Sequence, residues 1–550
     1  MKVTKTEQNV NITKNNRPSF KSGGSAFLQY LATNQAVGAN AVDVAFMVVP
    51  RTASDTIRRG PLAGAETVRR EASGTANHTL VGIYGITAGA LVSAIMGIDR
   101  KYGTKSNQIM TAPETLNILA ENKALQISKD QQQKDYLKTT FENVKAFNPA
   151  SKKADEKGFV KISKETIDEV VKIMDNAIND KDMNFKKWSG KKVHNSFDVV
   201  VNKITADTGA QTKYVLESID KTAEKNISET NLKTLLEDIY KVSEAFNKER
   251  VKEAFEAQLK SGSGIKGNEF VKKLSKFKNI KSIAGFAIAA GVGMSIQPLN
   301  MYLTKKKTGQ DGFVGVEGRT KDTSNGFKAL KVASSLAFFG LVLATLKSGL
   351  KGFMGKMAFK GYWPTLDQLK GVYGLTIISR LMAARDKDEL RESLTKDFLG
   401  FLSWLVLGDF VNKMTAEALD KNLEKTVMNR SHDVAKKGYW SRVFNSSLKN
   451  RDEILIETLA ENGIDTVKKD GDKIVAKKFK ELMKDVEKLP EATKKLTQKR
   501  IRALNKAQLV GYAFSGLVLG LGIPNLNIYI TNKLDKKRKA EAAAKAEMNQ

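Results

Sequence analysis

Three long stretches of this chain carry no charged residue, and they constrain its fold more than any other feature. They cover residues 79–98, 282–304 and 507–532. The hydrocarbon core of a bilayer is about 30 Å thick and a helix rises 1.5 Å per residue, so about 20 apolar residues span it. Each stretch is therefore long enough to form a membrane-spanning helix.

Four further apolar segments are shorter or interrupted by a charge: residues 26–49, 332–346, 371–384 and 398–411. Runs of about 10–15 residues fit a buried or re-entrant helix as well as a span. The chain has only nine prolines in 550 residues, which favours long helices with few interruptions. The sequence predicts an all-α protein: a membrane helix bundle of three long apolar helices and up to four weaker ones.

An alternative is that the apolar stretches are core helices of a large soluble protein, which are also apolar on all sides. Glycine content argues against it, because an interior glycine costs a helix in water about 1 kcal/mol relative to alanine, whereas small residues let helices approach closely in lipid. Basic residues flank both ends of all three stretches, so the usual asymmetry of charge across a span is missing. The soluble alternative therefore stays open.

Polar insertions divide the apolar segments into regions. Residues 99–281 and 412–506 show helical periodicity, and the Asp-Gly pair within residues 466–475 favours the turn of a short β-hairpin. The predicted order is a disordered segment (1–24), an amphipathic helix with a basic segment and the first membrane helix (25–98), a soluble helical insertion (99–281), membrane helices (282–411), a second polar insertion (412–506), the last membrane helix (507–532) and a basic tail (533–550).

The charge balance indicates a polyanionic partner, because 91 Lys and Arg stand against 60 Asp and Glu. The excess gathers at the ends of the apolar segments, which favours an anionic lipid membrane. Nucleic acid is disfavoured, since the basic residues are dispersed and no nucleic-acid-binding motif occurs. The 99–281 insertion is a candidate surface for other proteins. We expect a bacterial inner-membrane protein with its insertions facing the cytoplasm.

The residues offer little chemistry. There is no cysteine, the three histidines are far apart, and no phosphate-binding, nucleophile-elbow or zinc motif occurs. The sequence therefore predicts no metal, no cofactor and no catalytic site, and it identifies no small-molecule ligand. The leading interpretation is a membrane scaffold or interaction protein that binds anionic headgroups. The alternatives are a transporter or channel built on a duplicated broken helix, and a soluble pore-forming or nucleic-acid-binding helical protein.

Two clusters are candidate sites. Arg58, Arg59, Arg69 and Arg70 could bind headgroup phosphates through their guanidinium groups; the alternative is an exposed helix with local ion pairs. The second cluster could form an ion or proton pathway if its members converge on a polar cavity. The alternatives are a solvated turn with local ion pairs and, for Asp409, the end of a helix. Its members are Asp409, Arg380, Arg385, Asp386 and Asp388.

A short motif occurs twice. LNMYLT at residues 299–304 and LNIYIT at 526–531 each follow a proline within a glycine-rich apolar stretch. Proline interrupts a helix and tyrosine favours the headgroup level, so each motif predicts a helix break near a membrane interface. Duplication of a membrane module, shared interface chemistry and coincidence all remain open. The residues concerned are Pro298, Asn300, Tyr302, Pro524, Asn527 and Tyr529.

Overall fold

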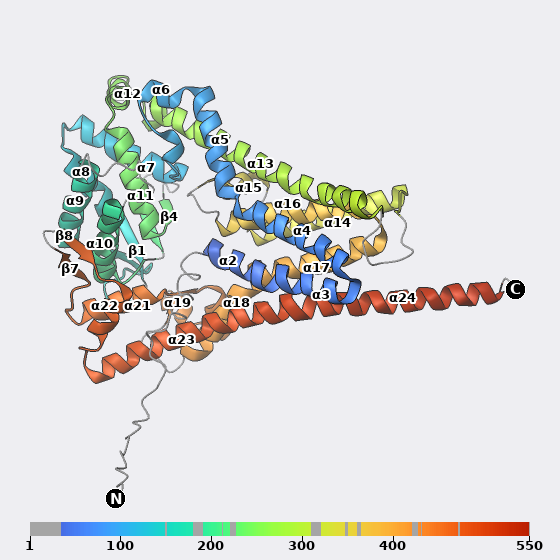
Figure 1. Cartoon of the computed structure of the whole chain (residues 1–550). Helices are drawn as coiled ribbons and strands as arrows, with labels where there is room; N and C mark the ends of the chain where they lie inside the picture. Colours follow the sequence, from blue (N-terminus) through green and yellow to red (C-terminus); the bar gives the residue numbers. More distant parts are fainter. Residues whose placement is uncertain are drawn as a thin grey trace, which may run out of the picture.

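The computed structural model describes residues 35–148, 151–179, 191–211, 213–219, 227–309, 321–346, 350–359, 365–420, 427–430, 432–470 and 473–548. These residues are mostly helical, which confirms the predicted class. The predicted disordered segment, residues 1–24, lies outside them. Figure 1 shows two parts: a bundle of long helices, and a set of shorter helices and strands gathered at one end of that bundle.

The bundle contains all the apolar segments within the described residues. Three of its helical pieces, η1, η5 and η6, are π-helical. Its elements are α2 (Gln35–Asp43), η1 (Val44–Val48), α3 (Val49–Arg59), α4 (Pro61–Thr79), α5 (Val81–Met96), α13 (Glu269–Thr308), α14 (Asn325–Thr345), α15 (Leu350–Lys356), α16 (Leu366–Ala383), α17 (Lys387–Leu402), η5 (Ser403–Leu407), α18 (Gly408–Asp420), α23 (Glu491–Gly516), η6 (Leu517–Gly522) and α24 (Ile523–Met548).

Three helices of the described chain are long and apolar enough to cross a membrane: α13, α14 and the continuous helix from α23 to α24. A fourth candidate is the pair α4 and α5, which is bent by 50°. Length and composition therefore indicate membrane association. Two of the stretches predicted from the sequence lie within α13 and the α23–α24 helix, and the first, residues 79–98, includes all of α5.

The two longest helices each pack against an antiparallel partner at glycine contacts. Helices α4 and α5 run beside α13, where the Cβ of a residue replacing Gly285 would lie 3.2 Å from the Cα of Gly85. Helices α17 and α18 run beside α23 and α24, with Asn412 against Gly511. The close approach at Gly285 requires a residue without a side chain.

Helix α13 and the α23–α24 helix run in the same direction. Helix α14 is antiparallel to α16, since Lys331 donates to Met382 O at one end and Lys370 to Thr345 O at the other. Helix α16 runs parallel to α13, and α17 and α18 then return antiparallel to the α23–α24 helix. Three crossings of the bundle therefore separate the two long helices.

The sequence predicted a helical first insertion, but the structure shows that this insertion also contains strands. It contains a four-stranded antiparallel sheet of order β2-β1-β3-β4. These strands have only three or four residues, too few for an alternating pattern to emerge. The elements are α6 (Ile98–Tyr102), η2 (Ser106–Gln108), α7 (Pro113–Ser128), α8 (Gln133–Glu142), β1 (Val144–Phe147), β2 (Phe159–Lys161), α9 (Lys164–Asn179), α10 (Lys191–Thr208), β3 (Tyr214–Glu217), β4 (Ile227–Thr230), α11 (Leu232–Phe246), α12 (Glu249–Lys260) and η4 (Ile265–Gly267).

The second insertion contains the predicted hairpin, in which β7 pairs with β8 and Asp470 lies opposite Lys473. Its elements are β5 (Met428–Asn429), α19 (His432–Ala435), α20 (Tyr439–Phe444), β6 (Ser447–Leu448), α21 (Arg451–Glu461), β7 (Val467–Asp470), β8 (Lys473–Ala476) and α22 (Phe479–Val486).

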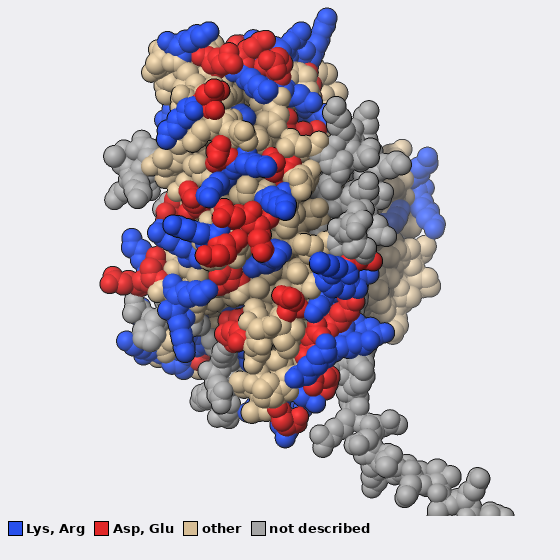
Figure 2. Space-filling model, turned by 90° about the vertical axis from the view of Figure 1, so that its left-hand side faces the viewer, with Lys and Arg blue, Asp and Glu red and all other residues tan. Residues whose placement is uncertain are grey.

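The two insertions pack against each other at the same end of the bundle. Helix α10 contacts α21 and β8, and Asn202 donates a hydrogen bond to Thr466 O at 3.0 Å. We call the joined insertions the polar body. Figure 2, which faces this end of the molecule, shows Lys and Arg interspersed with Asp and Glu. This face presents no surface of a single charge.

The bundle exposes large apolar side chains along its outer helices. Within the most apolar window of each of the three candidate spans, only 22–33% of residues are buried. Large apolar side chains exposed on several long helices are typical of a membrane or protein contact. We call this surface the apolar belt; it comprises Ile83, Leu91 and Ile95 on α5, Ile283, Val292, Met294, Leu299 and Leu303 on α13, Leu330, Val332 and Leu336 on α14, and Leu509, Val510, Leu517, Leu521 and Leu526 on the α23–α24 helix.

The predicted helix breaks are wrong, because both prolines lie inside continuous helix. Pro298 cannot donate to the carbonyl of Met294 four residues earlier. Ser379 on α16 supplies the missing donor, with its Oγ 3.0 Å from that oxygen. Pro524 lies at the start of α24, directly after the wider helical turn of η6.

The glycine contact predicts different outcomes for the same substitution at two positions of α13. A Cβ at Gly285 would lie 2.6 Å from the Phe359 ring, whereas a Cβ at Gly291 would meet nothing within 4 Å. We expect Gly285→Ala to lower the free energy of unfolding by about 1–3 kcal/mol through overpacking. Gly291→Ala should leave it unchanged or raise it by up to about 1 kcal/mol. Unfolding in mild detergent, followed by circular dichroism, measures both; equal effects would contradict the helix contact.

Candidate functional site

Four charged side chains meet inside the bundle. Arg51 on α3, Glu71 on α4, Arg380 on α16 and Asp397 on α17 are at most 5% exposed at their side chains. The Arg51 guanidinium lies 3.2 Å from Glu71 and 3.9 Å from Asp397, while that of Arg380 lies 3.2 Å from Glu71 and 3.0 Å from Asp397. We call these four residues the charge square, because each arginine contacts both carboxylates.

The two arginines of the charge square have matching surroundings. Arg51 donates to Lys396 O, the carbonyl before Asp397, and Arg380 donates to Arg70 O, the carbonyl before Glu71. Each therefore binds both the side chain and the neighbouring backbone of the other helix pair. In this way α3 and α4 interlock with α16 and α17.

Two glycines make room for the guanidinium groups. A Cβ at Gly74, three residues after Glu71, would lie 3.1 Å from Arg380 Nη2. A Cβ at Gly400, three residues after Asp397, would lie 3.0 Å from Arg51 Nη2. Both distances are shorter than an ordinary carbon–nitrogen contact, so a side chain at either position would displace an arginine of the opposite pair.

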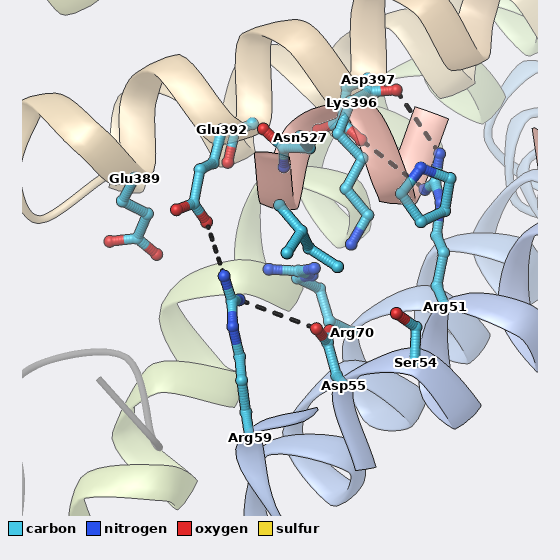
Figure 3. A pocket seen from close by; sticks show the side chains of 13 residues that line it. Arg51, Ser54, Asp55, Arg59, Arg70, Glu389, Glu392, Lys396, Asp397 and Asn527 are labelled. Carbon is cyan, nitrogen blue, oxygen red and sulfur yellow. Dashed lines mark hydrogen bonds and ion pairs between the residues drawn. The ribbon is translucent and has the colours of Figure 1, made fainter. Parts of the chain in front are cut away.

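A small cavity of about 40 Å³ adjoins the charge square (Figure 3). Four basic and four acidic side chains contribute to its wall, so their charges balance. Arg59 crosses it to Glu392 at 3.5 Å and lies 3.7 Å from Asp55. Such a space is polar and large enough for water. The lining residues are Arg51, Ser54, Asp55, Arg59, Arg70, Glu389, Glu392, Ser393, Lys396, Asp397, Pro524, Asn527 and Ile528.

The four arginines predicted to bind headgroups do not form one site. Arg59 and Arg70 line the cavity, and Arg70 pairs with Glu71 at 3.4 Å. Arg58 is exposed and donates to Asn525 Oδ1 at 2.8 Å, whereas Arg69 donates to Thr304 Oγ1 at 2.9 Å. Of the four, only Arg58 has an exposed side chain.

The residues predicted for an ion or proton pathway also separate. Arg380 belongs to the charge square, and Arg385 is buried in an ion pair with Glu389 at 2.8 Å. Asp386 caps the start of α17, and Asp388 lies 3.9 Å from Arg391. Asp409 is 62% exposed at its side chain and pairs with Lys413 at 3.0 Å. The structure therefore places Asp409 on the outer surface and not at the cavity.

The repeated motif is used in the same way in both long helices. Asn300 and Thr304 are buried, as are Asn527 and Thr531. Thr304 accepts a hydrogen bond from Arg69, and Thr531 accepts one from Arg391 at 2.8 Å. Each motif thus buries its asparagine and threonine, and the threonine meets an arginine of the antiparallel partner helix.

The second motif keeps this orientation despite one additional residue. Fifteen residues separate Gly285 from Asn300, but sixteen separate Gly511 from Asn527. One extra residue rotates everything that follows in an α-helix by about 100°. The π-helical piece η6 lies between Gly511 and Asn527, and a π-turn accommodates one extra residue.

Three members of the charge square, Arg51, Glu71 and Asp397, were not identified from the sequence. A usable signal is the recurrence of a basic–acidic pair followed by glycine: Arg70 and Glu71 precede Gly74 as Lys396 and Asp397 precede Gly400.

Within the described part of the chain, no group of three or more His, Cys, Asp or Glu residues could hold a metal ion. His78 is buried beside Asp43 at 3.2 Å and packs on the rings of Tyr373 and Trp404. No family model, curated protein or solved structure matches the chain.

The charge square predicts a large effect of neutralising one carboxylate. Glu71→Gln leaves two buried guanidinium groups facing only Asp397, so we expect the free energy of unfolding to fall by about 3–5 kcal/mol. Asp397→Asn should have a similar effect, because it contacts the same two arginines. Asp409→Asn is the control, since its exposed pair contributes at most about 1 kcal/mol. Equal stabilities of all three variants in detergent would contradict the assignment.

Proposed function

We propose that this protein is an integral membrane scaffold whose helix bundle anchors the polar body to a lipid bilayer. The apolar belt carries the proposal, because it leaves the most apolar windows of the long helices largely uncovered by the rest of the chain. Exposing that surface to water would cost about 25 cal/mol for each Å² of apolar area. Contact with lipid acyl chains keeps the apolar belt away from water, so no further part of the chain has to cover it.

The topology supports one location for both insertions. Helices α5 and α18 lead into them, and α13 and α23 lead out, at the same end of the bundle (Figure 1). Segments that leave and re-enter a bundle at one end lie on one side of a membrane. We assign that side to the cytoplasm of a bacterial inner membrane, with the polar body as the surface for partner proteins.

Anionic headgroups fit the opposite end. Tyr302 and Tyr529 are 61% and 65% exposed, and lysines follow each of them along the helix. Tyrosines at the headgroup level followed by lysines are typical of a membrane interface. The basic side chains in this proposal are Lys305, Lys306, Lys307, Lys533, Lys536, Lys537 and the exposed Arg58.

We further propose that the bundle arose by duplication of one unit. The first copy comprises α3, α4, α5, an insertion and α13; the second comprises α16, α17, α18, an insertion and the α23–α24 helix. The matched contacts of Arg51 and Arg380, and of Thr304 and Thr531, support this correspondence.

Membrane fractionation tests the main proposal. Because the chain has no cysteine, Glu249→Cys, Lys488→Cys and Lys306→Cys each introduce a unique label. We expect the protein to stay in the pellet after a carbonate wash and to dissolve only with detergent. A membrane-impermeant maleimide should label positions 249 and 488 from one side and position 306 from the other. Release by carbonate, or labelling of 249 and 488 from opposite sides, would reject it.

Lipid retention tests the headgroup proposal. We expect the triple substitution of Lys305, Lys306 and Lys307 by Gln to reduce the phosphatidylglycerol that co-purifies with the detergent-solubilised protein, since each lysine contributes about 1 kcal/mol at an anionic surface. Substituting three exposed lysines of the polar body, Lys138, Lys153 and Lys488, changes the net charge equally. Equal retention by the two variants, measured by mass spectrometry, would contradict a localised headgroup site.

A further inference from the structure

An exposed aromatic cluster lies where the second insertion meets the bundle. On the short helix α20, Trp440 and Phe444 stand four residues apart and are 57% and 65% exposed. Phe410 of α18 stacks against both, with ring centroids 6.2 Å from Trp440 and 5.0 Å from Phe444. Elsewhere on α20, Val443 is buried and Tyr439 donates to Met414 O. The helix is thus fixed with Trp440 and Phe444 directed outward.

The cluster sits at one edge of the apolar surface. Leu407, about one turn before Phe410, is an exposed apolar side chain. The exposed ion pair of Asp409 and Lys413 begins the polar part of α18. The three stacked rings therefore lie at the level where apolar surface gives way to charge.

This level is about one bilayer thickness from the other edge. Asn412, close to Phe410 on α18, contacts Gly511 on α23. From Gly511 the helix continues for 18 residues to the exposed Tyr529, which is about 27 Å at 1.5 Å per residue. The hydrocarbon core of a bilayer measures about 30 Å. The aromatic side chains of α20 and Tyr529 thus have the separation of the two aromatic belts that flank a membrane.

The charges beside the cluster fit a lipid surface. Lys436 and Lys437, just before α20, are exposed. Of the acidic groups beside it, Glu417 is buried and pairs with Arg430 and Arg442, and the exposed Asp409 pairs with Lys413. Exposed rings with lysines next to them, and with the nearby carboxylates paired with basic side chains, suit the anionic boundary between headgroups and acyl chains.

We infer that α20 is an interfacial anchor, with Trp440 and Phe444 inserted into the headgroup–acyl boundary of the leaflet that faces the polar body. The inference rests on the proposed membrane scaffold and extends it, because it places the second insertion in direct contact with lipid. The anchor fixes how close this insertion lies to the bilayer, and α18, on which α20 packs, fixes its lateral position.

Spin labels on single cysteines test this inference in the full chain. Trp440→Cys and Phe444→Cys are labelled after reconstitution into vesicles of phosphatidylethanolamine and phosphatidylglycerol. We expect collisions with oxygen, which concentrates in lipid, to exceed those with a water-soluble nickel chelate. Lys488→Cys, an exposed position on the same insertion, is the matched control and should favour the nickel chelate.

Quenching of Trp440 fluorescence is a second test, and it does not depend on the cysteine variants. Emission of the unmodified protein minus that of Trp440→Phe isolates Trp440, and lipids brominated near the headgroup should quench it more than lipids brominated at the chain ends. Preferential collision with nickel at 440 and 444, or quenching by aqueous iodide alone, would overturn the inference. Protection from every quencher would overturn it too, by assigning the rings to a protein contact. In each case retention in the carbonate pellet shows whether the scaffold proposal itself survives.

Discussion

The charge square is the interaction on which the arrangement of the bundle depends. Two arginines and two carboxylates, all nearly inaccessible to solvent, share their contacts so that neither helix pair satisfies its charges alone. Transferring such groups out of water costs several kcal/mol for each ion, and only close, well-directed partners offset that cost. The bundle has therefore to bring α3, α4, α16 and α17 together in one register, and Gly74 and Gly400 mark where a side chain would prevent it.

From this centre the structure extends in two directions. Towards one end, the antiparallel pairs lead into insertions that join as the polar body; towards the other, the repeated motifs direct threonines inward and tyrosines outward. Buried ion pairs lie beside an apolar core inside the bundle, and many large apolar side chains also face outward. The apolar outer surface is the feature on which the scaffold proposal relies.

Much of the fold was predictable because its signals are local. Uncharged runs of about twenty residues identify the long helices, and an Asp-Gly pair identifies the hairpin of β7 and β8. The charge square was not predictable in this way, since Glu71 and Asp397 lie far apart in sequence and each resembles an ordinary surface residue of a helix. The helix break predicted at Pro298 was wrong for a related reason. The hydrogen bond that the proline cannot donate to Met294 O is donated by Ser379, which belongs to another helix. The four-stranded sheet of the first insertion was not predicted, because each of its strands is too short to show an alternating pattern of apolar and polar residues.

The interlocking of the two helix pairs also imposes an order on biosynthesis. Asp397 is made 326 residues after Glu71. At the usual pace of about 5–20 residues per second, that interval lasts roughly 16–65 seconds. Throughout it, Arg51 lacks Asp397, Glu71 lacks Arg380, and no guanidinium group occupies the space beside Gly74. The first half of the chain therefore waits in an incomplete state for its counterpart, and a ribosome that stalls in between leaves that half unpaired.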